Sequence, residues 1–182
     1  MSLAHGCPSG RDPARTRVAS PAGFRDAESA YHRGMPSQTL EVRVAAFADL
    51  DARTFHDLLR LRIDVFVVEQ ACPYPELDGR DVEPGTRHLW LTRDGEVVAY
   101  LRILADPDGV ARIGRVVVAP AARGGGLAGR LMTEALAVVG DRPCVLEAQT
   151  HLVDFYAGHG FTVSGPGYVE DGIPHTPMRR PA

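Results

Sequence analysis

The sequence contains no lysine, and all 20 of its basic residues are arginine. We attribute this bias to the codon usage of a GC-rich genome and draw no functional conclusion from it. The sequence also lacks any run of 18 apolar residues, so we expect neither a membrane-spanning helix nor a membrane partner. Its three cysteines are an odd number without the spacing of a metal site, which predicts free thiols, no bound metal and a reducing cytoplasm.

The composition is that of one globular domain preceded by a different segment. Of the 182 residues, 45% are hydrophobic and 24% charged, and the net charge is −3. Residues 1–37 are rich in Gly, Pro, Ser and Ala and carry a charge of about +2, so we expect a flexible basic leader before a domain at 38–182. Met35 is an alternative start. The leader's arginines are scattered, and we do not expect nucleic-acid binding.

The stretch from Ile113 to Met132 carries the strongest functional signal. A strand-like run meets Pro120, then a cluster of glycines, then an amphipathic helical pattern. Such a junction binds anions, because the first N–H groups of a helix have no main-chain partner and the helix dipole is positive there. Glycine also lets the backbone approach a phosphate closely. The sequence therefore predicts a site for a phosphorylated cofactor.

Two nucleotide-binding motifs fit this stretch poorly. Gly124 and Gly129 have the spacing of a P-loop, but the lysine and the hydroxyl residue that must follow are missing. The dinucleotide pattern Gly-x-Gly-x-x-Gly is met literally, and Glu147 lies about 20 residues further on, where a ribose-binding acid belongs. However, that motif normally follows the first strand of a domain, and only 35 residues remain after Glu147.

A third pattern, Arg/Gln-x-x-Gly-x-Gly/Ala, is filled by Arg123, Gly126 and Ala128. It resembles the pyrophosphate-binding loop of the GNAT acyl-CoA-dependent N-acetyltransferases. The resemblance implies that acetyl-CoA is the cosubstrate. The residues implied to bind it are Val116, Val117, Val118, Arg123, Gly124, Gly125, Gly126, Leu127, Ala128 and Gly129. A glycine-rich turn that only caps a helix is the alternative.

The expected order of elements agrees with this resemblance. Alternation predicts a first strand at 40–46, Asp49 or Asp51 begins a helix, and a loop with one short helix covers 72–85. Further strands are expected at 88–93, 96–104, 110–119, 144–149, 162–164 and 175–180, with helices at 127–139 and 152–159. This is the GNAT order: an α+β (mixed α/β) fold with a mostly antiparallel sheet of six to seven strands, a parallel and splayed fourth–fifth pair, and helices on both faces.

Longer stretches resemble one branch, the ElaA-type N-acetyltransferases. They are Leu61–Gln70, Cys72–Tyr74, Asp78–Gly79, Thr86–His88, Glu147–Leu152 and Glu170–His175. The likeness covers residues 40 to 180 and implies acyl-CoA binding, but this branch is not tied to one acceptor.

Acyl transfer to an amine needs a proton donor for the departing thiolate and a base for the amine. Tyr156 matches the family's general acid, and packing on the cofactor is its alternative role. Glu147 and His151 are candidate bases, and Glu69 is a third candidate on the acceptor side. The resemblance also places His88 and His175 in the acceptor pocket; a structural polar role is equally open for both.

The expected function is transfer of an acetyl group from acetyl-CoA to a primary amine. Five acids and one base lie between Glu69 and Glu83, and their negative field would favour a cationic acceptor. A non-catalytic acyl-CoA-binding sensor or interaction module is the alternative function, and a homodimer is left open.

Overall fold

The structure is a computed structural model, and it describes residues 39–182. The expectations for the leader at 1–37 and for Met35 lie outside this range. The elements are β1 (Leu40–Ala45), α1 (Ala52–Arg62), β2 (Arg87–Arg93), β3 (Glu96–Ala105), β4 (Ala111–Val118), α2 (Leu127–Val139), β5 (Cys144–Gln149), α3 (Val153–Ala157), β6 (Thr162–Val163), β7 (Tyr168–Glu170) and β8 (Ile173–Arg180).

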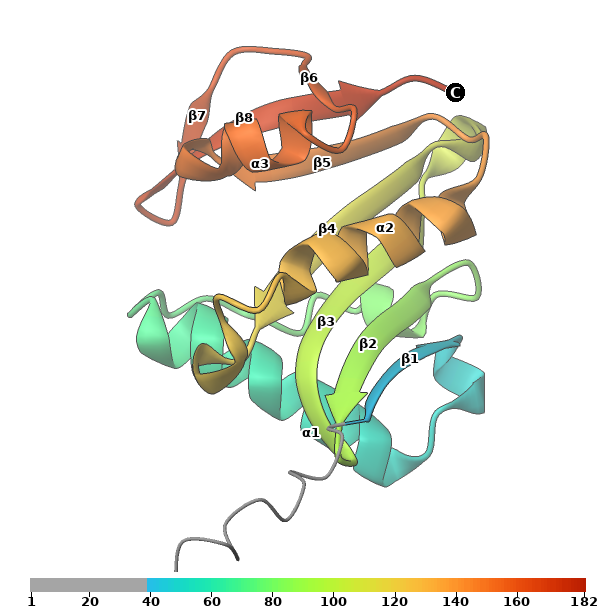
Figure 1. Ribbon diagram of the computed structural model, residues 1–182. Coiled ribbons are helices and arrows are strands. Elements are labelled where there is room, and N and C mark those ends of the chain that lie inside the picture. Colours follow the sequence, from blue (N-terminus) through green and yellow to red (C-terminus); the bar gives the residue numbers. More distant parts are fainter. Residues whose placement is uncertain (1–38) are drawn as a thin grey trace, which may run out of the picture. The chain divides into compact units, whose positions relative to one another are not determined.

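One mixed sheet contains all eight strands (Figure 1). Its order is β1-β2-β3-β4-β5-β8-β6, and β7 pairs with β8. The β4–β5 pair is parallel and the other pairs are antiparallel. The predicted GNAT fold is confirmed, with one strand more than the six or seven expected.

The additional strand is β7. The turn that joins it to β8 has the same Asp-Gly sequence as the turn between β2 and β3. Asp94 and Gly95 join β2 to β3 with φ angles of 51° and 86°. Asp171 and Gly172 join β7 to β8 with φ angles of 49° and 81°. Both are Asp-Gly turns with two positive φ angles, the backbone that two-residue hairpins require. The second Asp-Gly pair therefore predicts the missed hairpin.

Helix α1 begins as expected and then continues in a different form. The Asp51 carboxylate accepts a hydrogen bond from the Thr54 N–H at 2.8 Å, which caps the first turn. After Arg62 the chain continues as a π-helical segment, Ile63–Glu69, so the stretch around Val65 prolongs the helix and does not open a loop. The loop that follows contains a 3₁₀ turn, Arg80–Val82, as the short expected helix.

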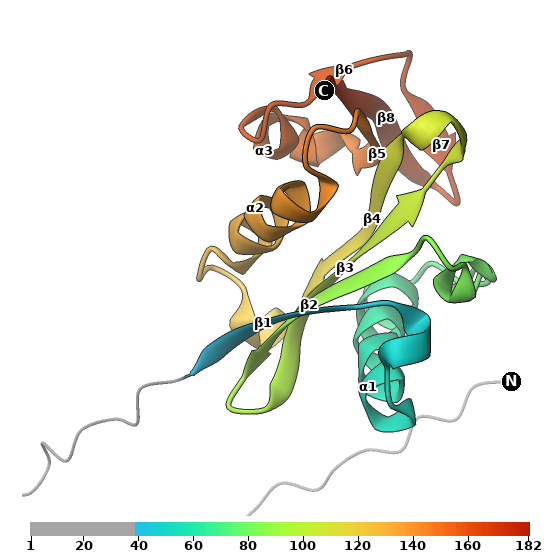
Figure 2. The same ribbon diagram turned by 90° about the vertical axis from the view of Figure 1, so that its right-hand side faces the viewer.

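Side chains that alternate along the strands create two cores, one on each face of the sheet. Leu89 and Leu91 of β2 pack into the core that includes the apolar face of α2. Trp90 of β2 and Tyr100 of β3 pack instead with Leu58 of α1. Figure 2 shows α1 and α2 on opposite sides of the sheet. Within residues 39–182, no helix is long and apolar enough to cross a membrane.

Candidate active site

The sheet opens between β4 and β5. These strands pair only at Ala111 with Cys144 and at Arg112 with Val145, and they diverge beyond these pairs (Figure 1). A cleft of about 670 Å³ lies at this opening, lined by both strands and by segments on both faces of the sheet. This volume is typical of small-molecule and cofactor sites. The predicted splay is confirmed, and the cleft lies at it.

A bulge in β4 lies on the wall of this cleft. Tyr100 of β3 pairs with Val117 and Arg102 pairs with Gly114, so β4 contains one residue more than β3 over this span. Arg115 takes up the extra residue with a φ of 56°, which is unusual for a residue other than glycine. The bulge thus lies directly after Gly114. Val116, Val117 and Val118 line the cleft just after it, as predicted for cofactor-binding residues.

The glycine loop leads from the cleft to the start of α2. Gly124 and Gly126 have φ angles of 80° and 73°, and a Cβ on either would meet no atom within 4 Å. The first helical bond runs from the Arg130 N–H to the Gly126 carbonyl, so the N–H groups of residues 127–129 have no helical acceptor. Gly124, Gly125, Gly126, Leu127, Ala128 and Gly129 do not line the cleft itself; they follow its last residue on this side, Arg123.

Two residues predicted for separate roles form one ion pair. The Arg123 guanidinium makes two contacts of 2.8 Å with the Glu69 carboxylate, and its Nε donates to the Val118 carbonyl at 3.2 Å. The guanidinium lowers the pKa of Glu69, chiefly by its hydrogen bonds. This pair connects the end of the π-helical segment to the glycine loop. It therefore engages the side chain of Arg123, a residue that the resemblance implied for cofactor binding.

Tyr156 lies at the cleft from the α3 side and is 6% exposed. Its ring packs edge-on against Phe155 and Phe161, with centroid separations of 5.0 and 6.3 Å. Burial raises the pKa of Tyr156 to about 12. The phenol is therefore neutral at physiological pH and still carries the proton that a general acid must donate.

The two candidate bases from β5 and its extension differ in their surroundings. Glu147 accepts a hydrogen bond from Arg112 at 3.2 Å and one from the Tyr168 hydroxyl at 3.3 Å. Both of its carboxylate oxygens are thus engaged. His151 lies on the 3₁₀ turn after β5, lines the cleft and is exposed.

The expectation for His88 needs correction, because the structure places this residue away from the cleft. His88 is 0% exposed. Its Nε2 donates to the Asp81 carbonyl at 3.0 Å, and its Nδ1 accepts from the Tyr100 hydroxyl at 2.8 Å. Burial is the main cause of its lowered pKa. His88 is a neutral structural link between the loop and β3. By contrast, His175 lines the cleft as expected.

A largely buried network of three arginines and three acids, called the buried network below, lies behind one wall of the cleft. Its members are Arg62, Glu76, Asp78, Asp81, Arg102 and Arg115. Arg62 lies 2.5 Å from Glu76 and 2.8 Å from Asp81, and Arg102 joins Asp81 to Asp78. Arg115 contacts Glu76 at 2.8 Å, and Tyr74 hydrogen-bonds to the same carboxylate. Arg102 and Arg115 line the cleft directly, so the network fixes that wall.

The network keeps Asp78 and Asp81 ionised. Burial alone would raise the pKa values of Asp78 and Asp81. For Asp78, hydrogen bonds from Arg102 and from the Arg80 backbone more than offset that effect, and for Asp81 those from Arg62 and Arg102 do, so both pKa values are lowered. The three positive and three negative side chains balance, which is the arrangement that makes buried charges tolerable.

This pairing changes the charge argument for a cationic acceptor. All five acids between Glu69 and Glu83 form ion pairs with arginines, so they create little net negative field. Two other acids, Glu170 and Asp171, line the cleft from the β7–β8 hairpin. Neither forms an ion pair with any residue in 39–182.

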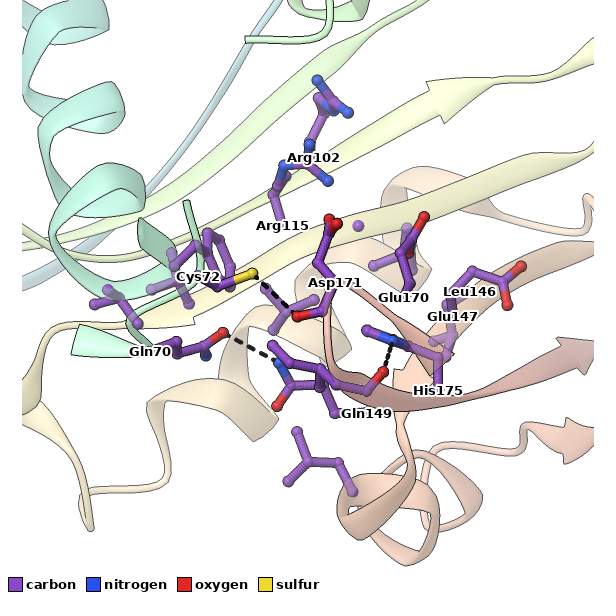
Figure 3. Close-up of a pocket in the computed structure, with 18 of the residues that line it drawn as sticks. Gln70, Cys72, Arg102, Arg115, Leu146, Glu147, Gln149, Glu170, Asp171 and His175 are labelled. Atoms are coloured by element: carbon purple, nitrogen blue, oxygen red, sulfur yellow. Dashed lines mark hydrogen bonds between the residues drawn. The ribbon is translucent and has the colours of Figure 1, made fainter. Parts of the chain in front are cut away.

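Two hydrogen bonds cross the cleft between segments far apart in the sequence (Figure 3). The Gln149 amide donates to the Gln70 side-chain oxygen at 3.3 Å. The Cys72 thiol donates to the Asp171 carbonyl at 3.6 Å. These contacts connect the chain after α1 to β5 and to the β7–β8 hairpin. All four residues lie in the ElaA-like stretches, but their contacts are not deducible from sequence.

The fold and the cleft correspond to a known protein family. The model of the acetyltransferase (GNAT) domain matches residues 56–181. The chain belongs to the GNAT acetyltransferase family. GNAT proteins are acyltransferases that use acyl-CoA, and this activity class fits the splayed strands and the glycine loop. Within residues 39–182, no group of three His, Cys, Asp or Glu side chains is arranged to hold a metal ion.

Several known proteins are similar to this chain in sequence or in structure. A UPF0039 protein of Mycobacterium bovis is 56% identical over 137 residues, which covers 73% of this chain and 88% of the relative. Protein ElaA of Escherichia coli is 42% identical over 139 residues, covering 73% and 91%. The crystal structure of an acyl-CoA N-acyltransferase from Pseudomonas aeruginosa superposes with a TM-score of 0.74 at 44% identity, covering 77% of this chain and 99% of that one. The predicted likeness to ElaA-type GNAT proteins is confirmed.

Proposed function

We propose that the protein transfers an acetyl group from acetyl-CoA to the primary amine of a cationic acceptor. The observation that carries this proposal is the open β4–β5 splay, whose cleft runs past the bulge at Arg115 to Arg123, just before the glycine loop that leads into α2. A long, thin ligand with a phosphate at one end and a reactive group at the other suits such a cleft. Acetyl-CoA has this shape and chemistry.

The residues present fit acetyl-CoA at two points. The N–H groups of residues 127–129 and the positive end of the 13-residue helix α2 suit the pyrophosphate. Within residues 39–182, the β4 edge that faces β5 has no strand partner beyond Arg112, so the backbone of Val116 and Val117 can pair with the amides of the pantetheine arm. The Val118 carbonyl already accepts a hydrogen bond from Arg123. A backbone N–H at the bulge would polarise the thioester carbonyl.

Tyr156 supplies the proton for the departing sulfur. Its hydroxyl makes no hydrogen bond to any described residue, and burial is the only cause of its raised pKa. The same apolar surroundings would disfavour a thiolate, so they raise the affinity of the sulfur for that proton. Neutral phenol and neutral thiol are thus both favoured in this part of the cleft.

The acceptor amine enters from the wall formed by the β7–β8 hairpin and the buried network. Glu170 and Asp171 supply unpaired negative charge there, which supports a cationic amine. We also propose the cytoplasm as the compartment, which the free, buried thiols of Cys72 and Cys144 support.

Ligand-dependent thermal unfolding tests cofactor choice directly. Acetyl-CoA should raise the unfolding temperature, because a ligand that binds only the folded state adds about 2.7 kcal/mol of stability at 100 times its Kd. NAD and ATP at the same concentration should leave it unchanged. A rise with NAD and none with acetyl-CoA would instead support a dinucleotide site at the glycine loop.

A further inference from the structure

His175 has a fixed orientation on the wall of the cleft. It lies on β8 directly opposite Gln149 of β5, and its ring stacks on Tyr168 with centroids 5.8 Å apart. Paired residues on adjacent strands share one face of the sheet, so His175 lies on the face that carries Gln149. That face is opposite the one on which Ala148 and Leu146 enter the core with α2.

The hydrogen bond of the ring fixes which nitrogen is protonated. The His175 Nδ1 lies 2.9 Å from the Ile173 carbonyl (Figure 3). A carbonyl oxygen only accepts, so Nδ1 is the donor and carries the proton of the neutral ring. Nε2 then has a free lone pair and makes no hydrogen bond to any described residue. A base needs this arrangement, with one nitrogen oriented by the protein and the other open to the substrate.

The strand pairing gives the level of His175 along the sheet. Counting along β4 and β5 from the Arg112–Val145 pair brings Gln149, and therefore His175, level with the residues just after the Arg115 bulge. These are the residues expected beside the thioester. The two carboxylate candidates are engaged, Glu69 by Arg123 and Glu147 by Arg112 and Tyr168. The remaining candidate, His151, is exposed and has no hydrogen bond to a described residue that would orient its ring.

We propose that His175 is the general base, an assignment that rests on the proposed acetyl transfer. His175 Nε2 takes one proton from the amine nitrogen as the new C–N bond forms to the acetyl carbon. Tyr156 gives its proton to the sulfur as the C–S bond breaks, so the products are the N-acetylated amine and free coenzyme A thiol. Solvent then removes the proton from His175 and restores the phenol of Tyr156.

The tautomer is testable without turnover. In ¹⁵N-histidine-labelled protein, long-range ¹H–¹⁵N spectra distinguish a protonated Nδ1 from a protonated Nε2, and the His175→Gln variant identifies the signal. We expect Nδ1–H and an unprotonated Nε2. A neutral ring protonated at Nε2 would overturn the assignment to His175, whatever the activity of the protein.

The kinetic test compares wild type, His175→Gln and Glu147→Gln with an amine that wild type acetylates. Other ionisable groups on the same part of the cleft are Cys72, Glu147, His151, Tyr168, Glu170 and Asp171. Wild-type kcat should rise with pH, because a general base acts only in its unprotonated form. His175→Gln should lower kcat by about 10²- to 10⁴-fold and remove this dependence. Glu147→Gln should retain it.

His56→Gln is the matched control, because His56 is an exposed histidine on α1 whose side chain is 70% accessible. It should keep wild-type kinetics. If His175→Gln keeps both kcat and the pH dependence, or if Glu147→Gln alone removes the dependence, His175 is not the base. A wild-type protein that acetylates no amine would contradict the proposed function itself, whereas the NMR result would still report on His175.

Discussion

Burial of Tyr156 has two opposite effects on its proposed role. It keeps the phenol protonated, because its pKa rises to about 12. It also makes the phenol a weaker acid, so donation is effective only as the sulfur develops charge in the same apolar surroundings. The hydroxyl is then essential to turnover but not to binding.

Tyr156→Phe tests this role, since it removes only the hydroxyl. We expect kcat to fall by about 10²- to 10⁴-fold, the usual range for a general acid. The acetyl-CoA-induced rise in unfolding temperature should be retained, because the ring still packs against Phe155 and Phe161. Steady-state kinetics at saturating substrate provide the measurement. Near-wild-type kcat would reduce Tyr156 to a packing residue.

Substitution of Arg62 tests how much the buried network contributes to the unfolding free energy. Arg62→Ala leaves Glu76 and Asp81 without their shared buried cation and should cost about 3–5 kcal/mol of unfolding free energy. Arg53→Ala is the control: it also lies on α1 and contacts Asp57, but its side chain is 88% exposed, so the cost should stay below about 0.5 kcal/mol. Urea denaturation measures both. Equal effects would mean that the network adds little to stability.

At the scale of single residues, the sequence predicts which side chains line the cleft better than it predicts which residues form ion pairs. Tyr156, Glu147, His151 and His175 were identified by resemblance, and all four line the cleft. The arginine–acid network was not predicted, because charged residues are normally exposed and the pairing depends on contacts across the fold. One local signal existed: Arg62 occupies a position in the apolar helical repeat of α1, where a charged residue requires a buried partner.

Among the elements, the junction between the glycine loop and α2 is the one on which cofactor binding depends. Asn and Asp both tolerate the positive φ of Gly126, and they have nearly the same size. Gly126→Asp should lose most of the acetyl-CoA-induced rise in unfolding temperature, because its carboxylate repels the pyrophosphate. Gly126→Asn should keep most of it.

The two variants also separate repulsion from misfolding. Asp is a favourable residue at the start of a helix, so the ligand-free Gly126→Asp protein should be at least as stable as Gly126→Asn. If both variants respond equally to acetyl-CoA, the pyrophosphate does not bind at this helix end. If the Asp variant is unstable without ligand, the loss of binding would reflect the fold.

Local sequence determined most elements but not their exact extent. Strand alternation, the Asp51 cap and the first Asp-Gly turn each act within a few residues, so they are readable from sequence. The π-helical continuation from Ile63 and the short strand β7 depend on partners elsewhere in the fold. Short strands gain their stability from pairing more than from their own residues.

For the domain as a whole, the lowered pKa values of Asp78 and Asp81 predict sensitivity to acid. Both groups bind protons less readily when folded than when unfolded, where their pKa is about 3.9. Their contribution to stability is therefore complete above that value and is lost as the pH falls below it. The unfolding free energy should decline below about pH 4 by up to about 1.4 kcal/mol per pH unit for each group.

Urea denaturation between pH 3 and pH 7 measures this decline. Asp78→Asn removes one of the two groups and should make the decline shallower. Asp141→Asn, in an exposed turn after α2, should leave its slope unchanged. A wild-type unfolding free energy that stays constant down to about pH 3 would show that these acids are not stabilised by the arginines.

Release of coenzyme A thiol from acetyl-CoA, measured across a panel of amines, tests the proposed function most directly. The panel should contain diamines, monoamines without a second charged group, and amino acids. Mass spectrometry should identify the product. We predict that at least one cationic amine stimulates thiol release well above background, with one N-acetylated product formed per thiol. If acetyl-CoA stabilises the fold but no amine stimulates release, the protein binds acyl-CoA without catalysing transfer, and the proposed function is wrong.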